Sequence, residues 1–155
     1  MRRLPILVFA SLTGTVVFAA GTLATPESGL TRTPYGRGAH PDVGTVDIEA
    51  GKETVVYSIT LDPGGSTGWH THPGAVIFVI RSGTVTQYGL DGPACTARTL
   101  ETGQAYIAPD HAHHPHLARN DGTEPVVAIV TAFNTPRGQP SRVDAEPPAE
   151  CPDLR

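Results

Sequence analysis

The residues best suited to chemistry in this chain are histidines, six of which fall in two clusters. The first cluster contains His70 and His72, and the second spans residues 111–116 and contains His114 and His116. On a β-strand, residues i and i+2 point to the same face, so each pair would project together from Cα atoms about 7 Å apart. Imidazoles at that spacing can converge on one metal ion, with nitrogen–metal distances of about 2.1 Å.

Two interpretations of these pairs remain open at this stage. Neutral imidazole suits zinc, iron, copper or nickel and does not suit calcium or magnesium, so a transition metal is the first interpretation. The second is a hydrogen-bonding pocket that holds no metal. We expect His111 and His113 to lie on a loop and face solvent, and His40 is isolated and receives no role.

Short strands must position these histidines. The segment 53–61 is rich in β-branched and aromatic residues and ends at a Gly/Pro turn, which is typical of a strand. No segment shows a helical period, and Gly (17) and Pro (15) favour many turns. The further strands that we expect span residues 45–48, 68–72, 75–80, 84–88, 97–100, 104–107, 114–119 and 126–133. Such a series of short strands predicts an all-β sandwich or barrel.

The N-terminus has the pattern of a secretory signal peptide over residues 1–24. Arg2 and Arg3 form a basic start, an apolar stretch follows, and small residues lead to Ala24. The alternative is an uncleaved membrane anchor, because the apolar stretch is near the lower limit for spanning a bilayer. After cleavage we expect a secreted or extracytoplasmic protein with no membrane contact.

The rest of the chain divides by composition. Residues 25–42 read as an N-terminal arm or linker, residues 43–133 as the barrel, and residues 134–155 as a Pro-rich C-terminal tail. In an oxidising compartment, an even cysteine count indicates a disulfide, here between Cys95 and Cys151. This bridge would attach the tail to the barrel. Two free thiols are the alternative.

The charge distribution argues against nucleic acid as a partner. The formal net charge is −4, Lys52 is the single lysine, and no basic run follows the N-terminus. A chain of this kind lacks the positive surface that phosphate backbones require. We therefore expect a small-molecule ligand.

Two spaced motifs resemble those of the cupin superfamily. The first family motif has a glycine, five intervening residues and His-x-His, then three or four residues, a glutamate, six intervening residues and a second glycine. This chain has Gly64, His70 with His72, Val76 and Gly83 at the matching places.

The second motif lies further along the chain. Here the family has a glycine, five intervening residues, Pro-x-Gly, two residues, a histidine, three residues and an asparagine. This chain has Gly103, Pro109, His116 and Asn120. The resemblance covers about residues 45–133. It implies the cupin-type double-stranded β-helix, a jelly-roll barrel.

The resemblance implies a divalent transition metal (Fe, Mn, Ni, Cu or Zn) held by His70, His72 and His116. Val76 occupies the place of the family's ligand glutamate, so the implied site has three histidines and no carboxylate, similar to that of some cupin dioxygenases. The second motif is two residues longer than the family's, so His114 fits the spacing from Pro109 and His116 fits the spacing to Asn120. We favour His116, because loop length varies more easily than strand position.

Three classes of function fit these features. The first is a metal-dependent enzyme acting by oxygenation, isomerisation or hydrolysis, with Tyr88 or His114 as the proton donor or acceptor. The second is a module that binds a metal or small molecule without turnover, which the loss of the carboxylate at Val76 favours. The third is a dry structural barrel, which the paired histidines argue against. Cupins often pair through sheet edges, so the resemblance allows a homodimer.

Overall fold

The computed structural model describes residues 28, 30–42, 44–91, 93–108, 114–152 and 154. Contacts divide the chain into a leading unit that ends at Arg32 and a compact unit, Thr33–Arg155. The predicted signal peptide lies outside the described residues. Within the described part of the chain, no helix is long and apolar enough to cross a membrane.

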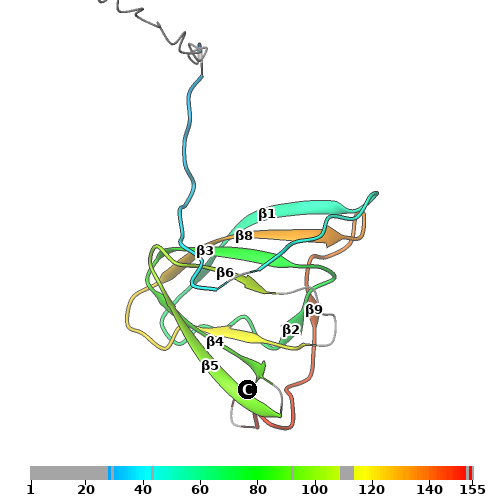
Figure 1. Cartoon of the computed structure of the whole chain (residues 1–155). Helices are drawn as coiled ribbons and strands as arrows, with labels where there is room; N and C mark the ends of the chain where they lie inside the picture. Colours follow the sequence, from blue (N-terminus) through cyan, green and yellow to red (C-terminus); the bar gives the residue numbers. More distant parts are fainter. Residues whose placement is uncertain are drawn as a thin grey trace, which may run out of the picture. The chain divides into compact units, whose positions relative to one another are not determined.

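The described residues of the compact unit form strands and no helix, which confirms the predicted all-β class (Figure 1). The strands are β1 Glu53–Leu61, β2 His70–Thr71, β3 Val76–Ser82, β4 Thr84–Asp91, β5 Ala94–Glu101, β6 Ala105–Ala108, β7 Leu117–Arg119, β8 Val126–Thr135 and β9 Val143–Asp144. β1 has the predicted bounds, whereas β2 and β7 are shorter than the sequence suggests.

The strands are grouped in three sheets rather than one closed barrel, in the jelly-roll arrangement that was predicted. One sheet has the order β1-β8-β3-β6, a second has the order β5-β4-β7, and β2 pairs with β9. All ladders within these sheets are antiparallel. In such ladders alternate side chains face the interior. β8 shows this directly, because its buried and half-buried residues alternate.

Apolar side chains from the two larger sheets fill one end of the interior. The buried cluster there consists of Leu61, Ile80, Val85, Leu100, Val126 and Ala128. Asn120, fully buried beside this end, donates from its side-chain amide to the carbonyl oxygens of Leu61 (2.9 Å) and Glu124 (2.8 Å). The asparagine of the second motif therefore has a structural role.

The C-terminal tail is attached to the sheets and is not a free extension. Cys95 and Cys151 form a disulfide with a Cα–Cα distance of 5.4 Å, which confirms the predicted pairing. Trp69 is buried against Leu117 and Cys151, and its indole N–H donates to the carbonyl of Leu154. The sequence pattern did not predict β9, the short strand of the tail that pairs with β2.

The predicted strand at residues 45–48 is wrong. This segment is held by a side chain instead of a ladder: the amide of Asn134 donates to the carbonyl of Asp47 (2.9 Å), and its oxygen accepts from the N–H of Glu49 (2.9 Å). Part of the predicted arm also contacts the sheets, because Ala39 forms a bridge with Gln104. The division of the chain at residue 42 stays a prediction.

Candidate metal centre

The main chain places His70 and His116 opposite each other. They form an antiparallel bridge in which each main-chain N–H donates to the other's carbonyl, both at 3.0 Å. The pairing continues on one side, where Thr67 N–H donates to the carbonyl of Ala118 (2.9 Å). Opposed residues of an antiparallel pair point to the same face. Their imidazoles therefore leave the backbone side by side.

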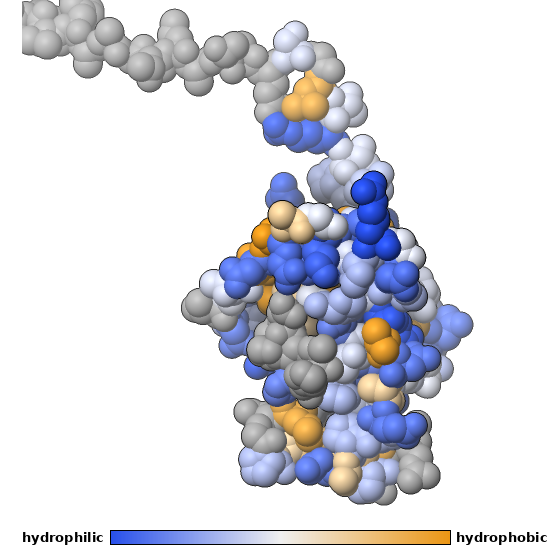
Figure 2. Space-filling model, turned by 90° about the vertical axis from the view of Figure 1, so that its right-hand side faces the viewer, coloured by the Kyte–Doolittle hydropathy of each residue, from blue (hydrophilic) through white to orange (hydrophobic). Residues whose placement is uncertain are grey.

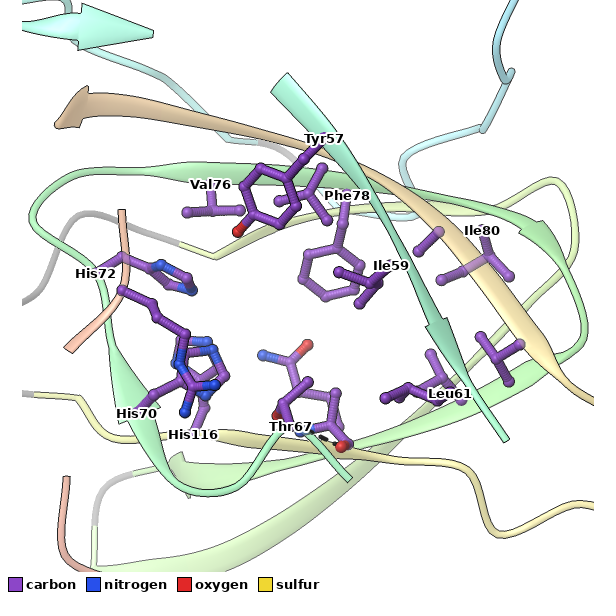
Figure 3. A pocket seen from close by; sticks show the side chains of 17 residues that line it. Tyr57, Ile59, Leu61, Thr67, His70, His72, Val76, Phe78, Ile80 and His116 are labelled. Atoms are coloured by element: carbon purple, nitrogen blue, oxygen red, sulfur yellow. Dashed lines mark hydrogen bonds between the residues drawn. The ribbon is translucent and has the colours of Figure 1, made fainter. Parts of the chain in front are cut away.

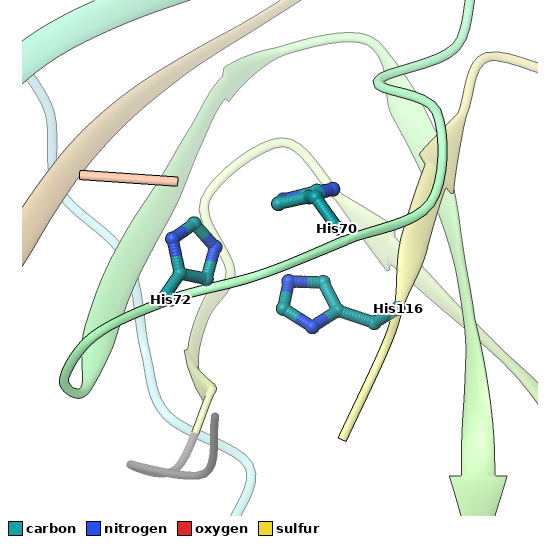
Figure 4. Close-up of side chains that lie close together, drawn as sticks. All are labelled: His70, His72 and His116. Atoms are coloured by element: carbon teal, nitrogen blue, oxygen red, sulfur yellow. The ribbon is translucent and has the colours of Figure 1, made fainter. Parts of the chain in front are cut away.

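His72 completes the cluster from two residues beyond His70. The ring centroids are 4.5 Å apart for His70 and His116, 4.8 Å for His70 and His72, and 5.0 Å for His72 and His116. The nitrogen atoms that could serve as ligands lie within 4.8 Å of one another. Figure 4 shows the three rings grouped around one point. One ion with bonds of about 2.1 Å to all three rings requires ligand nitrogens within about 4.2 Å of one another, so the rings would have to move slightly closer together to bind it.

Main-chain carbonyls fix the tautomer of all three rings. In each ring Nδ1 faces a main-chain carbonyl oxygen. The distances are 2.9 Å from His70 to Gly68, 2.8 Å from His72 to Ser141 and 3.3 Å from His116 to His114. A carbonyl oxygen can only accept, so Nδ1 carries the proton in each neutral ring. The lone pair is left on Nε2, as in histidines that bind metals.

The surroundings keep these rings uncharged at neutral pH. The pKa of His70 is lowered to about 3, chiefly by burial and to a smaller extent by repulsion from His116. The pKa of His116 is lowered to about 4, again chiefly by burial and to a smaller extent by repulsion from His72. The pKa of His72 is also lowered, chiefly by burial. Metal ions bind the neutral form of imidazole, so the ligands need no deprotonation.

The histidines lie at one end of an internal cavity of about 120 Å³. Its lining consists of Tyr57, Ile59, Leu61, Thr67, His70, His72, Val76, Phe78, Ile80, Val85, Gln87, His116, Ala118, Val126, Ala128, Val130 and Arg142. Figure 3 shows the three histidines at one end and Ile80 and Leu61 at the other. Most of the remaining lining is apolar, with Tyr57, Thr67 and Gln87 as polar exceptions.

The cavity lining contains no carboxylate among the described residues. Val76, at the place of the family's glutamate, is 1% exposed and packs with Val130 and Ala132. The structure thus puts a hydrocarbon side chain where a fourth ligand would lie. The site offers three neutral nitrogen ligands, a donor set that suits Fe, Ni, Cu or Zn.

The sequence analysis missed most of the other lining residues, among them Tyr57, Gln87 and Arg142. Tyr57 shares the inner face of β1 with Ile59, and strand alternation could have revealed it. Gln87 lines the cavity from β4, and its buried side-chain oxygen has no hydrogen-bond partner among the described residues. Arg142 comes from the tail, and no periodicity in the sequence marks it. An unpaired buried oxygen indicates a place for water or a ligand.

Of the two residues predicted to transfer protons, Tyr88 does not line the cavity. The Tyr88 hydroxyl donates to Asp121 (2.9 Å) and accepts from Arg119 (3.1 Å), and the ring packs beside Trp69 and Leu117. Tyr88 is one residue from Gln87 on β4 and does not line the histidine cavity, so this placement gives no support to the prediction.

His114 is exposed and is not part of the three-histidine cluster. It lines a neighbouring pocket with His72 and His116, at the rim of the site. Its carbonyl oxygen lies 3.3 Å from Nδ1 of His116. His111, His113 and Pro109 lie outside the described residues.

The comparisons with known proteins agree with this architecture. A family model described as "Cupin domain" matches residues 57–132, which include all three histidines. No curated protein sequence matches the chain.

Solved structures show the same fold. An uncharacterized conserved protein with a double-stranded β-helix domain from Klebsiella pneumoniae is 23% identical, with a TM-score of 0.50 over 75% of this chain and 90% of that one. An oxalate oxidase is 21% identical, with a TM-score of 0.50 over 59% of this chain and 46% of the oxidase chain. An oxalate decarboxylase from Lactobacillus farciminis is 18% identical, with a TM-score of 0.50 over 60% and 27%. The chain spans less than half the length of these two enzyme chains, and these similarities establish the fold alone.

Proposed function

The chain belongs to the cupin superfamily, and on this premise we propose that it is an exported protein that holds one divalent transition metal through His70, His72 and His116. The metal would face a small-molecule ligand in the adjoining cavity. The observation that carries this proposal is the set of three Nδ1–carbonyl contacts, which leaves Nε2 of each ring with its lone pair.

The arrangement fits a site that is open to a ligand. Three protein ligands leave coordination positions vacant, and a metal there would act as a Lewis acid on a bound oxygen atom. We propose a metal-dependent oxygenase or isomerase as the enzymatic form of this function. Within the chain, Tyr57 supplies a hydroxyl to the cavity and His114 lies at its rim, so these two are the candidates for moving a proton.

A non-enzymatic binding module is the second candidate. The specific observation in its favour is the absence of a carboxylate from the described lining residues, with Val76 buried where the family has a glutamate. Without that group the cavity has no acidic general base. A module of this kind would bind the metal or the ligand and release it unchanged.

Export is the remaining part of the proposal. It rests on the signal-peptide pattern of residues 1–24 and on the Cys95–Cys151 disulfide, since disulfides persist in oxidising compartments. Expression of the full chain, followed by mass measurement of the protein from the extracytoplasmic fraction, tests it. Cleavage near Ala24 supports export, and recovery of the intact chain in the cytoplasm with reduced cysteines contradicts it.

Metal analysis tests the site. Protein purified without chelator should contain about one equivalent of a transition metal, and the His70→Ala/His72→Ala variant should contain almost none. His40→Ala is the matched control, because His40 is exposed and distant from the cluster, and should keep its metal. Full metal content in the double variant would overturn the ligand assignment. Turnover of a small-molecule panel by the loaded protein then separates the enzyme from the binding module.

A further inference from the structure

Arg142 is the charged side chain among the described residues that line the cavity. Main-chain contacts on both sides hold it there: the preceding carbonyl, of Ser141, binds His72 Nδ1 at 2.8 Å, and the following residue, Val143, pairs with Thr71. A Cβ atom built on Gly68 would lie 3.8 Å from Arg142 Nη2. The guanidinium is therefore beside the histidine end of the cavity.

Among the described residues, no negative side chain inside the cavity balances the positive charge of Arg142 at the histidine end. The histidines are neutral, no carboxylate lines the cavity, and the positive charge of Arg142 is among the causes that lower the pKa of each of the three rings. A divalent metal would add two further positive charges. A ligand that brings a negative charge would thus be favoured at this place.

Asp144 is the residue that could cancel this charge. Arg142 Nη2 donates to its carboxylate at 2.7 Å, but the Asp144 side chain is 90% exposed and does not line the cavity. A guanidinium has five N–H donors, so this contact leaves others available. Because the pair is largely exposed to water, it neutralises the guanidinium only weakly.

The opposite end of the cavity limits the rest of the ligand. Hydrocarbon side chains line it, including Leu61, Ile80 and Val126. A second charge placed among them would be buried without a partner, which is costly. A volume of about 120 Å³ is small beside the roughly 300–1,000 Å³ of sites for drug-sized ligands, so the cavity fits a small molecule.

From these observations we propose that the ligand is a small monocarboxylate with an apolar body, and that Arg142 selects it by binding its carboxylate at the histidine end. A planar guanidinium matches a carboxylate with two parallel hydrogen bonds. The apolar body would extend toward Phe78 and Ile59. The inference depends on the proposed function only where it invokes the bound metal. Recognition of the anion by Arg142 and the cavity does not require that metal.

Propionate and propionamide are the probes that test this assignment, because they have the same shape and differ in charge. Calorimetric titration of the wild-type protein, both metal-loaded and metal-free, should show propionate binding at least about tenfold more tightly than propionamide. The Arg142→Gln variant should lose this preference, whereas Arg142→Lys should keep part of it. Metal content is measured in every sample.

Two matched variants separate anion recognition from a structural role. Arg137→Gln makes the same charge change on the same tail at a side chain that is 89% exposed and outside the cavity, so it should leave the preference unchanged. Asp144→Asn removes the ion pair but keeps the guanidinium, so it should preserve or increase the preference. If Asp144→Asn behaves like Arg142→Gln, Arg142 acts through the tail and the inference fails.

Failure of this inference can be told apart from failure of the metal site. Wild-type protein that takes up no metal, but prefers propionate through Arg142, contradicts the proposed function and supports the inference. Metal-loaded protein that binds propionate and propionamide equally, or binds neither, overturns the inference and leaves the metal site intact. Preferential binding of the dianion malonate over propionate would also overturn it, because the apolar end offers no partner for a second carboxylate.

Discussion

His70 and His116 are joined by two reciprocal main-chain hydrogen bonds of 3.0 Å, although 46 positions separate them in the sequence. This pair sets the register between β2 and the start of β7. A slip of one residue in that register would turn one imidazole away from the other. The backbone therefore places two of the three imidazoles of the candidate metal centre side by side.

Replacing Val76 by glutamate should strengthen metal binding. The variant places a carboxylate where the family has its glutamate, beside His72. The Val76 side chain that it replaces is 1% exposed. A buried carboxylate attracts a divalent ion, so we expect about tenfold tighter binding in competition with a chelator, and a lower melting temperature without metal.

The control for this change lies at the other end of the cavity. Val126 is equally buried but packs with Leu61 and Ile80, away from the histidines. Val126→Glu should destabilise the protein with or without metal and should not tighten metal binding. Equal effects of the two glutamates on metal affinity would contradict the assignment of Val76 to the centre.

The metal-free protein should lose stability as the pH falls from about 7 to about 5. The pKa of His70 falls from 6.5 to about 3 on folding, and that of His116 falls to about 4, chiefly through burial. Below about 6.5 the unfolded chain binds protons at these rings and the folded chain does not, so the free energy of unfolding decreases. Urea denaturation at several pH values measures this slope.

A variant without the two imidazoles provides the comparison for the pH series. His70→Asn/His116→Asn removes both titrating rings, so its stability should change less over the same pH interval. The prediction is wrong if the two proteins show the same slope.

Removal of the disulfide should destabilise the protein. The Cys95–Cys151 bridge spans a sequence separation of 56 and holds the tail that carries Arg142. Closing a loop of this length stabilises a fold by about 2–4 kcal/mol. The Cys95→Ser/Cys151→Ser variant should lose about this much in urea denaturation. A reductant should lower the stability of the wild type and leave the variant unchanged; insensitivity of the wild type would contradict the bridge.

Asn120→Ala should lower the free energy of unfolding by about 2–3 kcal/mol, because it removes a buried hydrogen bond to the carbonyl of Leu61 and a partly buried one to the carbonyl of Glu124. Gln139→Ala is the matched control, since Gln139 is exposed, and should change little. Chemical denaturation of both variants checks the prediction. Similar losses in the two would show that the Asn120 contacts do not stabilise the fold.

The homodimer that the family resemblance allows is still a prediction. Figure 2 shows a face whose coloured surface is largely hydrophilic, with apolar residues in small separate patches. Among the described residues, the exposed large hydrophobic side chains are Leu30, Tyr35, Ile48, Val56 and Val143. Sedimentation of the purified protein measures its oligomeric state directly.

Local pattern was enough to predict much of this molecule. Alternation and turn residues predicted β1 with its observed bounds and placed His70 and His72 on one face, because strand periodicity is a property of neighbouring residues. The cysteine count predicted the bridge between Cys95 and Cys151 for a similar reason, since two cysteines allow a single intramolecular pairing.

Only the tertiary structure decided which distant side chains meet. It brought His116 rather than His114 to the first histidine pair, added Arg142 from a tail that has no periodic pattern, and turned Tyr88 away from the cavity. These outcomes depend on the register between segments far apart in the chain. Sequence periodicity encodes which face of a strand a residue occupies, but it does not encode which strand lies opposite.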